Sequence, residues 1–177
     1  MTGHRYRPAI VVGLFWFGIY GAAQAASGPI TKADTIAIKH YLRTREREII
    51  DSSSRFFASH LPGSKLTIVY LEYGKACATG GCTLILLHSR AGALHEQGYF
   101  SVFRPITLLA TFHFGQPDIG VQGRWDPTGK GWVRYQFPLR FNGRRYHELQ
   151  KVHLANAGQP LKGQILIGKQ DRGIPVY

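Results

Sequence analysis

The chain has 177 residues, of which 44% are hydrophobic and 12% aromatic, so it suits a single folded domain and is not intrinsically disordered. Its 22 Lys and Arg residues outnumber 10 Asp and Glu residues, and the net charge of +12 favours anionic partners without identifying one. Two cysteines are too few for a disulfide-dense small fold or a four-cysteine zinc site.

The first 25 residues have the pattern of a cleaved signal peptide. Two arginines precede an apolar run over residues 9–20, and Ala23 and Ala25 supply the small side chains that a signal peptidase requires before the cut. An uncleaved membrane anchor is the alternative, but the apolar stretch lies at the short limit of a span. Cleavage after Ala25 would leave one domain, residues 26–177, with a formal charge of +10. We therefore expect a periplasmic or secreted protein with no stable membrane span after processing.

An amphipathic helix is predicted over residues 32–59, either continuous or broken at the serines 52–54. Thr31 and Asp34 have the spacing of a capping box at its start. The arginines of this segment are expected on a solvated face rather than on a surface for nucleic acid or membrane, because glutamates dilute their charge. Four apolar residues recur at about the helical period: Ile38, Leu42, Ile49 and Phe56.

Strands are predicted from residue 66 onward. Residues 66–71 and 83–87 are apolar on both faces, as in central strands covered on two sides, whereas residues 133–141 alternate strictly. Pro138 places the alternating strand at an edge or at a bulge, and Asn142-Gly143 predicts a hairpin turn after it. Weaker strand candidates are residues 99–103, 108–114, 119–122 and 164–167.

These elements predict an α+β fold, in which one N-terminal amphipathic helix packs on a mainly antiparallel sheet of about five to seven strands. The domain core is expected over residues 31–153. The glycine-rich stretch from about residue 154 is expected to be loosely attached.

Cys77 and Cys82 flank a glycine-containing loop between the two most apolar strands. Thiols of an exported protein are normally oxidised, and the glycines allow the tight reversal that bonding requires. A redox-active pair would prefer a Cys-x-x-Cys spacing. The sequence therefore predicts a structural disulfide that contributes about 2 kcal/mol.

The same loop resembles a family signature. Residues 77–84 read Cys-Ala-Thr-Gly-Gly-Cys-Thr-Leu, and they resemble the Cys-x-x-Gly-Gly-Cys-Thr-Leu loop of a family of small exported bacterial proteins of unknown function. The similarity extends to residues 104–106, 118–119 and 139–146. The resemblance implies export and the disulfide, and it implies no catalytic residue.

Signatures of catalysis are scarce. The chain has no Gly-x-Ser-x-Gly elbow, no P-loop and no His-Glu-x-x-His motif. His88, His95 and the adjacent Glu96 do not supply a recognisable ligand set, so no metal or other cofactor is predicted. Glu72 and Glu96 are the weak catalytic candidates, because two carboxylates can act as acid and base in a hydrolase.

Arginines gather among aromatic residues in the last third of the chain. Arg134 and Arg140 should point away from the core if the alternating residues face it, and the hairpin would fold Arg144 and Arg145 back beside them. The simpler alternative is a sheet with aromatic residues inside and solvated arginines outside. Such a site would bind an anionic envelope component (lipid headgroup, polysaccharide or peptidoglycan) or an acidic protein, with nucleic acid not expected.

The sequence thus favours an exported basic binding or accessory protein without enzymatic activity, and a small envelope hydrolase that uses a carboxylate pair is the alternative.

Overall fold

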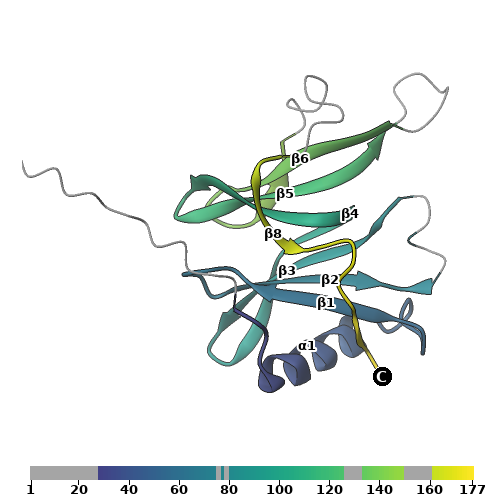
Figure 1. Ribbon diagram of the computed structural model, residues 1–177. Helices are drawn as coiled ribbons and strands as arrows, with labels where there is room; N and C mark the ends of the chain where they lie inside the picture. The colour runs from purple at the N-terminus through teal and green to yellow at the C-terminus, as the bar shows by residue number, and fades with distance from the viewer. Residues whose placement is uncertain (1–27, 75–76, 78–79, 126–132, 150–160) are drawn as a thin grey trace, which may run out of the picture.

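The computed structural model describes residues 28–74, 77, 80–125, 133–149 and 161–177 (Figure 1). Within these residues the chain forms one helix, α1 (Lys32–Arg45), and nine strands that pair antiparallel. The strands are β1 (Arg55–His60), β2 (Leu66–Glu72), β3 (Cys82–Arg90), β4 (Ala93–His113), β5 (Gln116–Trp125), β6 (Val133–Phe141), β7 (Tyr146–Glu148), β8 (Gly163–Ile167) and β9 (Ile174–Pro175). The predicted α+β class, with one helix and a mainly antiparallel sheet, is confirmed, but the described strands outnumber the five to seven expected.

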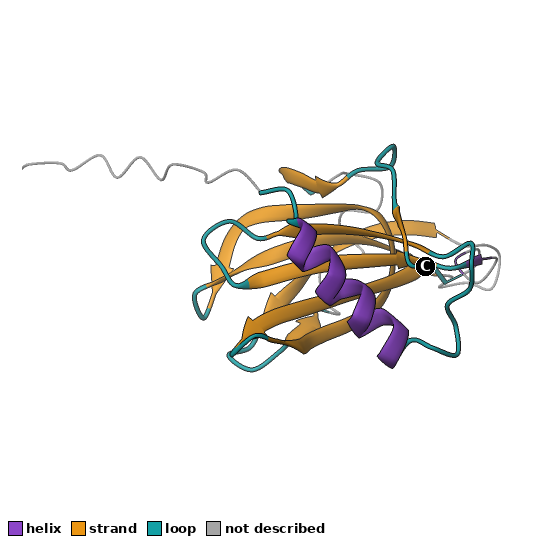
Figure 2. Ribbon diagram, turned by 90° about the horizontal axis from the view of Figure 1, so that it is seen from below, coloured by secondary structure: helices purple, strands orange, loops and turns teal. Residues whose placement is uncertain are grey.

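The long strand β4 belongs to two sheets. Its first part pairs with β3 and completes a first sheet in the order β9-β1-β2-β3-β4. From Phe103 onward it pairs with β5 on one side and β8 on the other, and it forms a second sheet with β5, β6 and β7. Figure 1 shows the two sheets as stacked layers, with α1 below the first sheet. Seen from below, α1 crosses the strands of the first sheet (Figure 2).

The first sheet is covered on both faces. In β2, Leu66, Ile68 and Tyr70 pack between the two sheets, whereas Val69 and Leu71 belong to the cluster between α1 and the first sheet. All five side chains are buried. This alternation confirms the prediction that this apolar strand is central and buried on both sides, because each parity has its own core to fill.

The predicted helix is too long. α1 ends at Arg45, and the residues expected to continue it over 46–59 include the strand β1, which begins at Arg55. Phe56 packs in the cluster between α1 and the first sheet, and Phe57 packs between the two sheets. Successive side chains reach opposite faces only in a strand, so two-sided burial overrides the helical spacing of the apolar residues.

The C-terminal stretch is part of the fold rather than loosely attached. β8 pairs with β4, and β9 pairs with β1. Val176 is fully buried in the cluster between α1 and the first sheet, and its carbonyl accepts a hydrogen bond from Arg43 Nη2 at 2.7 Å. The expectation was therefore wrong for residues 161–177, where two short strands complete the sheets, whereas residues 150–160 and the predicted signal peptide lie outside the described residues.

The predicted hairpin after β6 is confirmed, and residues 142–145 form its loop. Phe141 pairs with Tyr146, and the side-chain oxygen of Asn142 accepts hydrogen bonds at 3.0 Å from the backbone N–H groups two and three residues later. β7 pairs with residues 139–141, so Pro138 lies just beyond the stretch that pairs with β7, although it pairs with Gly120 of β5 on the other side. Its missing N–H therefore costs no bond to β7, as expected for an edge position.

Candidate functional site

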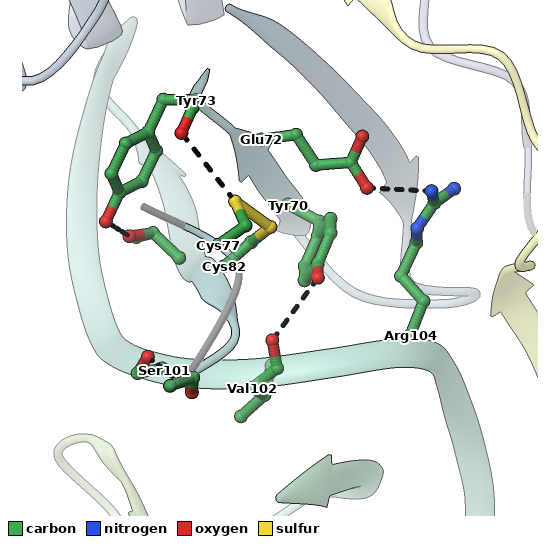
Figure 3. Close-up of a disulfide and its surroundings, with 10 residues drawn as sticks. Tyr70, Glu72, Tyr73, Cys77, Cys82, Ser101, Val102 and Arg104 are labelled. Atoms are coloured by element: carbon green, nitrogen blue, oxygen red, sulfur yellow. Dashed lines mark hydrogen bonds and ion pairs between the residues drawn. A yellow bond between two sulfur atoms is a disulfide. The ribbon is translucent and has the colours of Figure 1, made fainter. Parts of the chain in front are cut away.

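Cys77 and Cys82 form the predicted disulfide, with their Cα atoms 4.5 Å apart (Figure 3). Gly81 has a φ of 95°, and the backbone of Val102 leaves no room for a Cβ there. Ser101 Oγ also donates a hydrogen bond to the loop at 2.9 Å. Both sulfur atoms are bonded and Cys82 is buried, so the bridge fixes the loop to β4 as a structural element.

Glu72, one of the two predicted catalytic carboxylates, lies beside this loop and binds an arginine. Its Oε1 is 2.7 Å from Arg104 Nη2 (Figure 3). The same guanidinium lies over the Phe57 ring at 4.2 Å and donates to the Gly168 carbonyl at 2.9 Å. Glu72 therefore completes a junction between β2, β4 and the segment after β8.

Glu96, the second predicted carboxylate, lies on the other face of the first sheet. It is paired with Leu87, which packs between α1 and the first sheet, and it accepts a hydrogen bond from Tyr41 of α1 at 2.9 Å. Glu72 follows Leu71, which also packs between α1 and the first sheet, so Glu72 points to the face of the sheet opposite α1. The structure therefore does not bring the two carboxylates together as an acid–base pair.

A different carboxylate approaches Glu96, and the sequence did not single it out. Glu46, at the end of α1, accepts a hydrogen bond from Tyr99 of β4 at 3.1 Å. Burial raises the pKa of Glu46, and the charge of Glu96 raises it further. Burial and Glu96 likewise raise the pKa of Tyr41 to about 12. Because each carboxylate accepts from a tyrosine of the opposite element, these contacts attach α1 to β4 beside a groove of about 570 Å³ that Glu96 lines.

Arg134 lies far from the other predicted binding arginines. It pairs across the sheet with Arg124, and both guanidinium groups lie over the Phe103 ring, at 5.5 and 5.0 Å. Six residues of extended strand separate Arg134 from Arg140, which corresponds to about 20 Å. The expectation that all four arginines gather at one end of the sheet is therefore wrong.

Arg140 contacts a buried carboxylate. Its Nε and Nη2 atoms lie 3.4 Å from Asp118, whose side chain is only 1% exposed. Thr111 Oγ1 and His113 Nδ1 complete the environment of Asp118, each at 2.8 Å. Arg140 therefore joins β6 to the β4–β5 hairpin and offsets a buried charge, which explains why its guanidinium is not simply presented to solvent.

Arg144 and Arg145 are exposed, and their turn is one of four turns that are linked by a series of contacts at one end of the molecule. Ser64 Oγ donates to Gln116 Oε1 at 3.0 Å, and the carbonyl of Lys65 accepts from the β3 backbone at 3.0 Å. A Cβ on Gly143 would lie 3.6 Å from the Phe114 ring. We call this surface the turn end, and it comprises residues 62–65, 90–92, 114–115 and 142–145.

The turn end is basic. Its exposed charged side chains are Lys65, Arg90, Arg144 and Arg145, and none of the four turns contains an acidic residue. The first turn of α1 reaches the same end, where the carboxylate of Asp34 pairs with a histidine at the end of β1. The site thus combines two arginines that the sequence singled out with two basic residues that it missed, because the turns that carry these residues reach the same end only after the sheets have formed.

Two large aromatic side chains are exposed at the turn end or next to it. Phe114 is 75% exposed and Phe112 is 64% exposed, both on the β4–β5 hairpin. The sequence placed them in a candidate strand, but it gave no sign that they would remain outside the core.

Neither the family models, the curated proteins nor the solved structures provided a match to this chain. The resemblance of the cysteine loop therefore stays a prediction. In the part of the chain that the structure describes, no group of three or more His, Cys, Asp or Glu side chains is placed to hold a metal ion, although His88 and His95 pair across β3 and β4. No helix among the described residues is long and apolar enough to cross a membrane.

Proposed function

We propose that this protein is an exported binding protein, without enzymatic activity, that engages an anionic component of the cell envelope through the turn end. The observation that carries the proposal is the presence of four exposed basic side chains on contacting turns that contain no acid. Guanidinium groups bind phosphate and carboxylate oxygens in a two-pronged geometry, so phosphate- or carboxylate-bearing surfaces suit this site.

The geometry changes which residues should bind. Arg144 and Arg145 remain candidates, and Lys65 and Arg90 join them on the neighbouring turns. Arg140 acts as the partner of Asp118, so we assign it a positioning role behind the turn end.

Export is the second part of the proposal. It is supported by the signal-peptide pattern of residues 1–25 and by the disulfide, which persists in oxidising compartments. Intact-mass measurement of protein from the periplasmic or secreted fraction should give an N-terminus at Ala26. A full-length species in the membrane pellet would contradict it.

Retention on heparin tests the binding site. The double variant Arg144→Gln/Arg145→Gln should elute at lower salt than the wild type, because exposed charges are screened within about 8–10 Å at physiological salt. The matched control is Arg47→Gln/Arg172→Gln, which removes two exposed arginines outside the turn end. Equal elution shifts in the two variants would show that only net charge matters, and the proposed site would be wrong.

A further inference from the structure

The tip of the β4–β5 hairpin has an unexpected residue. Phe114 and Gly115 form the two-residue turn, with φ values of 50° and 74°. Positive φ at both positions is the pattern of a type I′ turn, which favours Asn, Asp or Gly, and a bulky side chain there is strained. The β3–β4 hairpin has the same pattern with Ala91 and Gly92, at 51° and 78°. The turn geometry therefore does not require an aromatic residue.

The surroundings of Phe114 do not explain it as a core residue either. Three quarters of its surface is exposed, and Phe112 is exposed to a similar degree two residues earlier. Between them, His113 Nδ1 donates a hydrogen bond to the buried carboxylate of Asp118 at 2.8 Å, which holds the hairpin in place. A strained backbone that presents an exposed aromatic ring points to a role outside the fold.

The charges around the rings indicate what they contact. Lys65, Arg144 and Arg145 lie on turns that contact this hairpin, and Arg90 lies on the turn beside Lys65. Apolar side chains with a basic surround are typical of surfaces that lie in the membrane interface, where cations attract anionic headgroups and rings enter the acyl boundary. A soluble polyanion would satisfy the basic residues, but it offers no apolar layer for two phenylalanine rings.

We propose that the turn end docks on an anionic lipid bilayer, with Phe112 and Phe114 inserted among the headgroups and the basic turns against the lipid phosphates. This inference rests on the proposed function and names the ligand of the same site.

Vesicle co-sedimentation of the exported protein tests this inference, with the N-terminus of every sample verified by intact mass. The wild type should bind vesicles of phosphatidylethanolamine and phosphatidylglycerol more tightly than vesicles of phosphatidylcholine, and added salt should weaken the binding. Phe114→Asn should weaken binding to the phosphatidylglycerol vesicles by about tenfold or more, because a ring that enters the interface is lost. Its retention on heparin should not change, since no charge is altered.

Two controls separate insertion from folding. Asn is favoured at the first position of a type I′ turn, so Phe114→Asn should fold with an unchanged or higher Tm. Ile165→Thr removes an apolar side chain that is 61% exposed on β8, away from the turn end, and it should bind vesicles like the wild type. Phe112→Thr, which suits a strand, should reproduce the loss seen for Phe114→Asn.

The possible failures are distinguishable. If Phe114→Asn and Phe112→Thr bind phosphatidylglycerol vesicles as well as the wild type does, insertion of the rings is wrong. If the wild type is retained on heparin but binds no vesicle, the lipid inference fails and an anionic polysaccharide or acidic protein becomes the ligand of the proposed site. If it binds neither, the proposed function itself is overturned.

Discussion

Replacing Arg140 by glutamine should lower the stability of the domain. Asp118 is 1% exposed and would keep its bonds from Thr111 and His113, but it would lose its arginine partner. Leaving a buried group less well satisfied costs about 1–3 kcal/mol. The 3.4 Å contact and the one-third exposure of Arg140 keep the cost below that of a fully buried pair. Each kcal/mol lowers the Tm by about 2–4 °C in a domain of this size.

Thermal and urea unfolding, followed by circular dichroism, measure this cost. Arg144→Gln is the control, and it should change stability by less than about 0.5 kcal/mol because the side chain is exposed. A double-mutant cycle with Asp118→Asn isolates the coupling, and Arg140→Gln should cost little once the carboxylate is gone. If Arg140→Gln left stability unchanged and abolished heparin retention, Arg140 would be a ligand contact, as the sequence alone suggested.

Three further predictions concern the fold. Leu42→Ala should cost about 2–5 kcal/mol in chemical unfolding, because Leu42 is fully buried between α1 and the first sheet. Hydrogen bonds from Thr31 and then His60 lower the pKa of Asp34 from 3.8 to about 2. The wild type should therefore be more stable than Asp34→Asn above pH 3.8, and this advantage should disappear as the pH falls towards 2 in paired acid-unfolding curves. Replacing both cysteines by serine should cost about 2 kcal/mol or less, since the closed loop is short; a larger loss of Tm would mean that the bridge also supports the packing of the loop on β4.

The strands were predictable because their signal is local. β2 and β3 are apolar on both parities, and both parities are buried in separate clusters. β6 alternates, and its residues Phe137, Leu139 and Phe141 face the core between the sheets. Such patterns survive folding, because the side-chain period of a strand is fixed by its backbone.

The helix boundary was not predictable from the same kind of signal. The spacing from Leu42 to Ile49 and Phe56 fits the helical period, yet Phe56 is buried from within a strand and Ile49 is 38% exposed. What decides between the two structures is the second core on the far side of the first sheet, which Phe57 fills. That core is assembled from residues distant in the chain, so the local sequence does not encode it.

The candidate site likewise combines features that the sequence predicts with features that it does not. The disulfide was predictable from the spacing of the cysteines and the compartment that the sequence predicts, because five residues of chain limit what the two sulfurs can reach. The partner of Arg140 did not, since Asp118 lies 22 residues away along the chain and meets it only across the pairing of β5 with β6. Glu72 and Glu96 were plausible as a pair for as long as the faces they occupy were unknown.

One end of the molecule carries stabilising contacts, whereas the turn end exposes charged and aromatic side chains. At one end, the disulfide and the junction of Glu72 with Arg104 tie strands and loop together. At the turn end, like charges repel, Phe114 occupies a strained conformation and two rings remain in water, and each of these features opposes folding. The Asp118 contacts offset part of that cost, because they fix the hairpin that carries the exposed rings to β6. A surface that is costly to maintain and rigidly supported is the arrangement expected of a binding site rather than of a neutral end of a sheet.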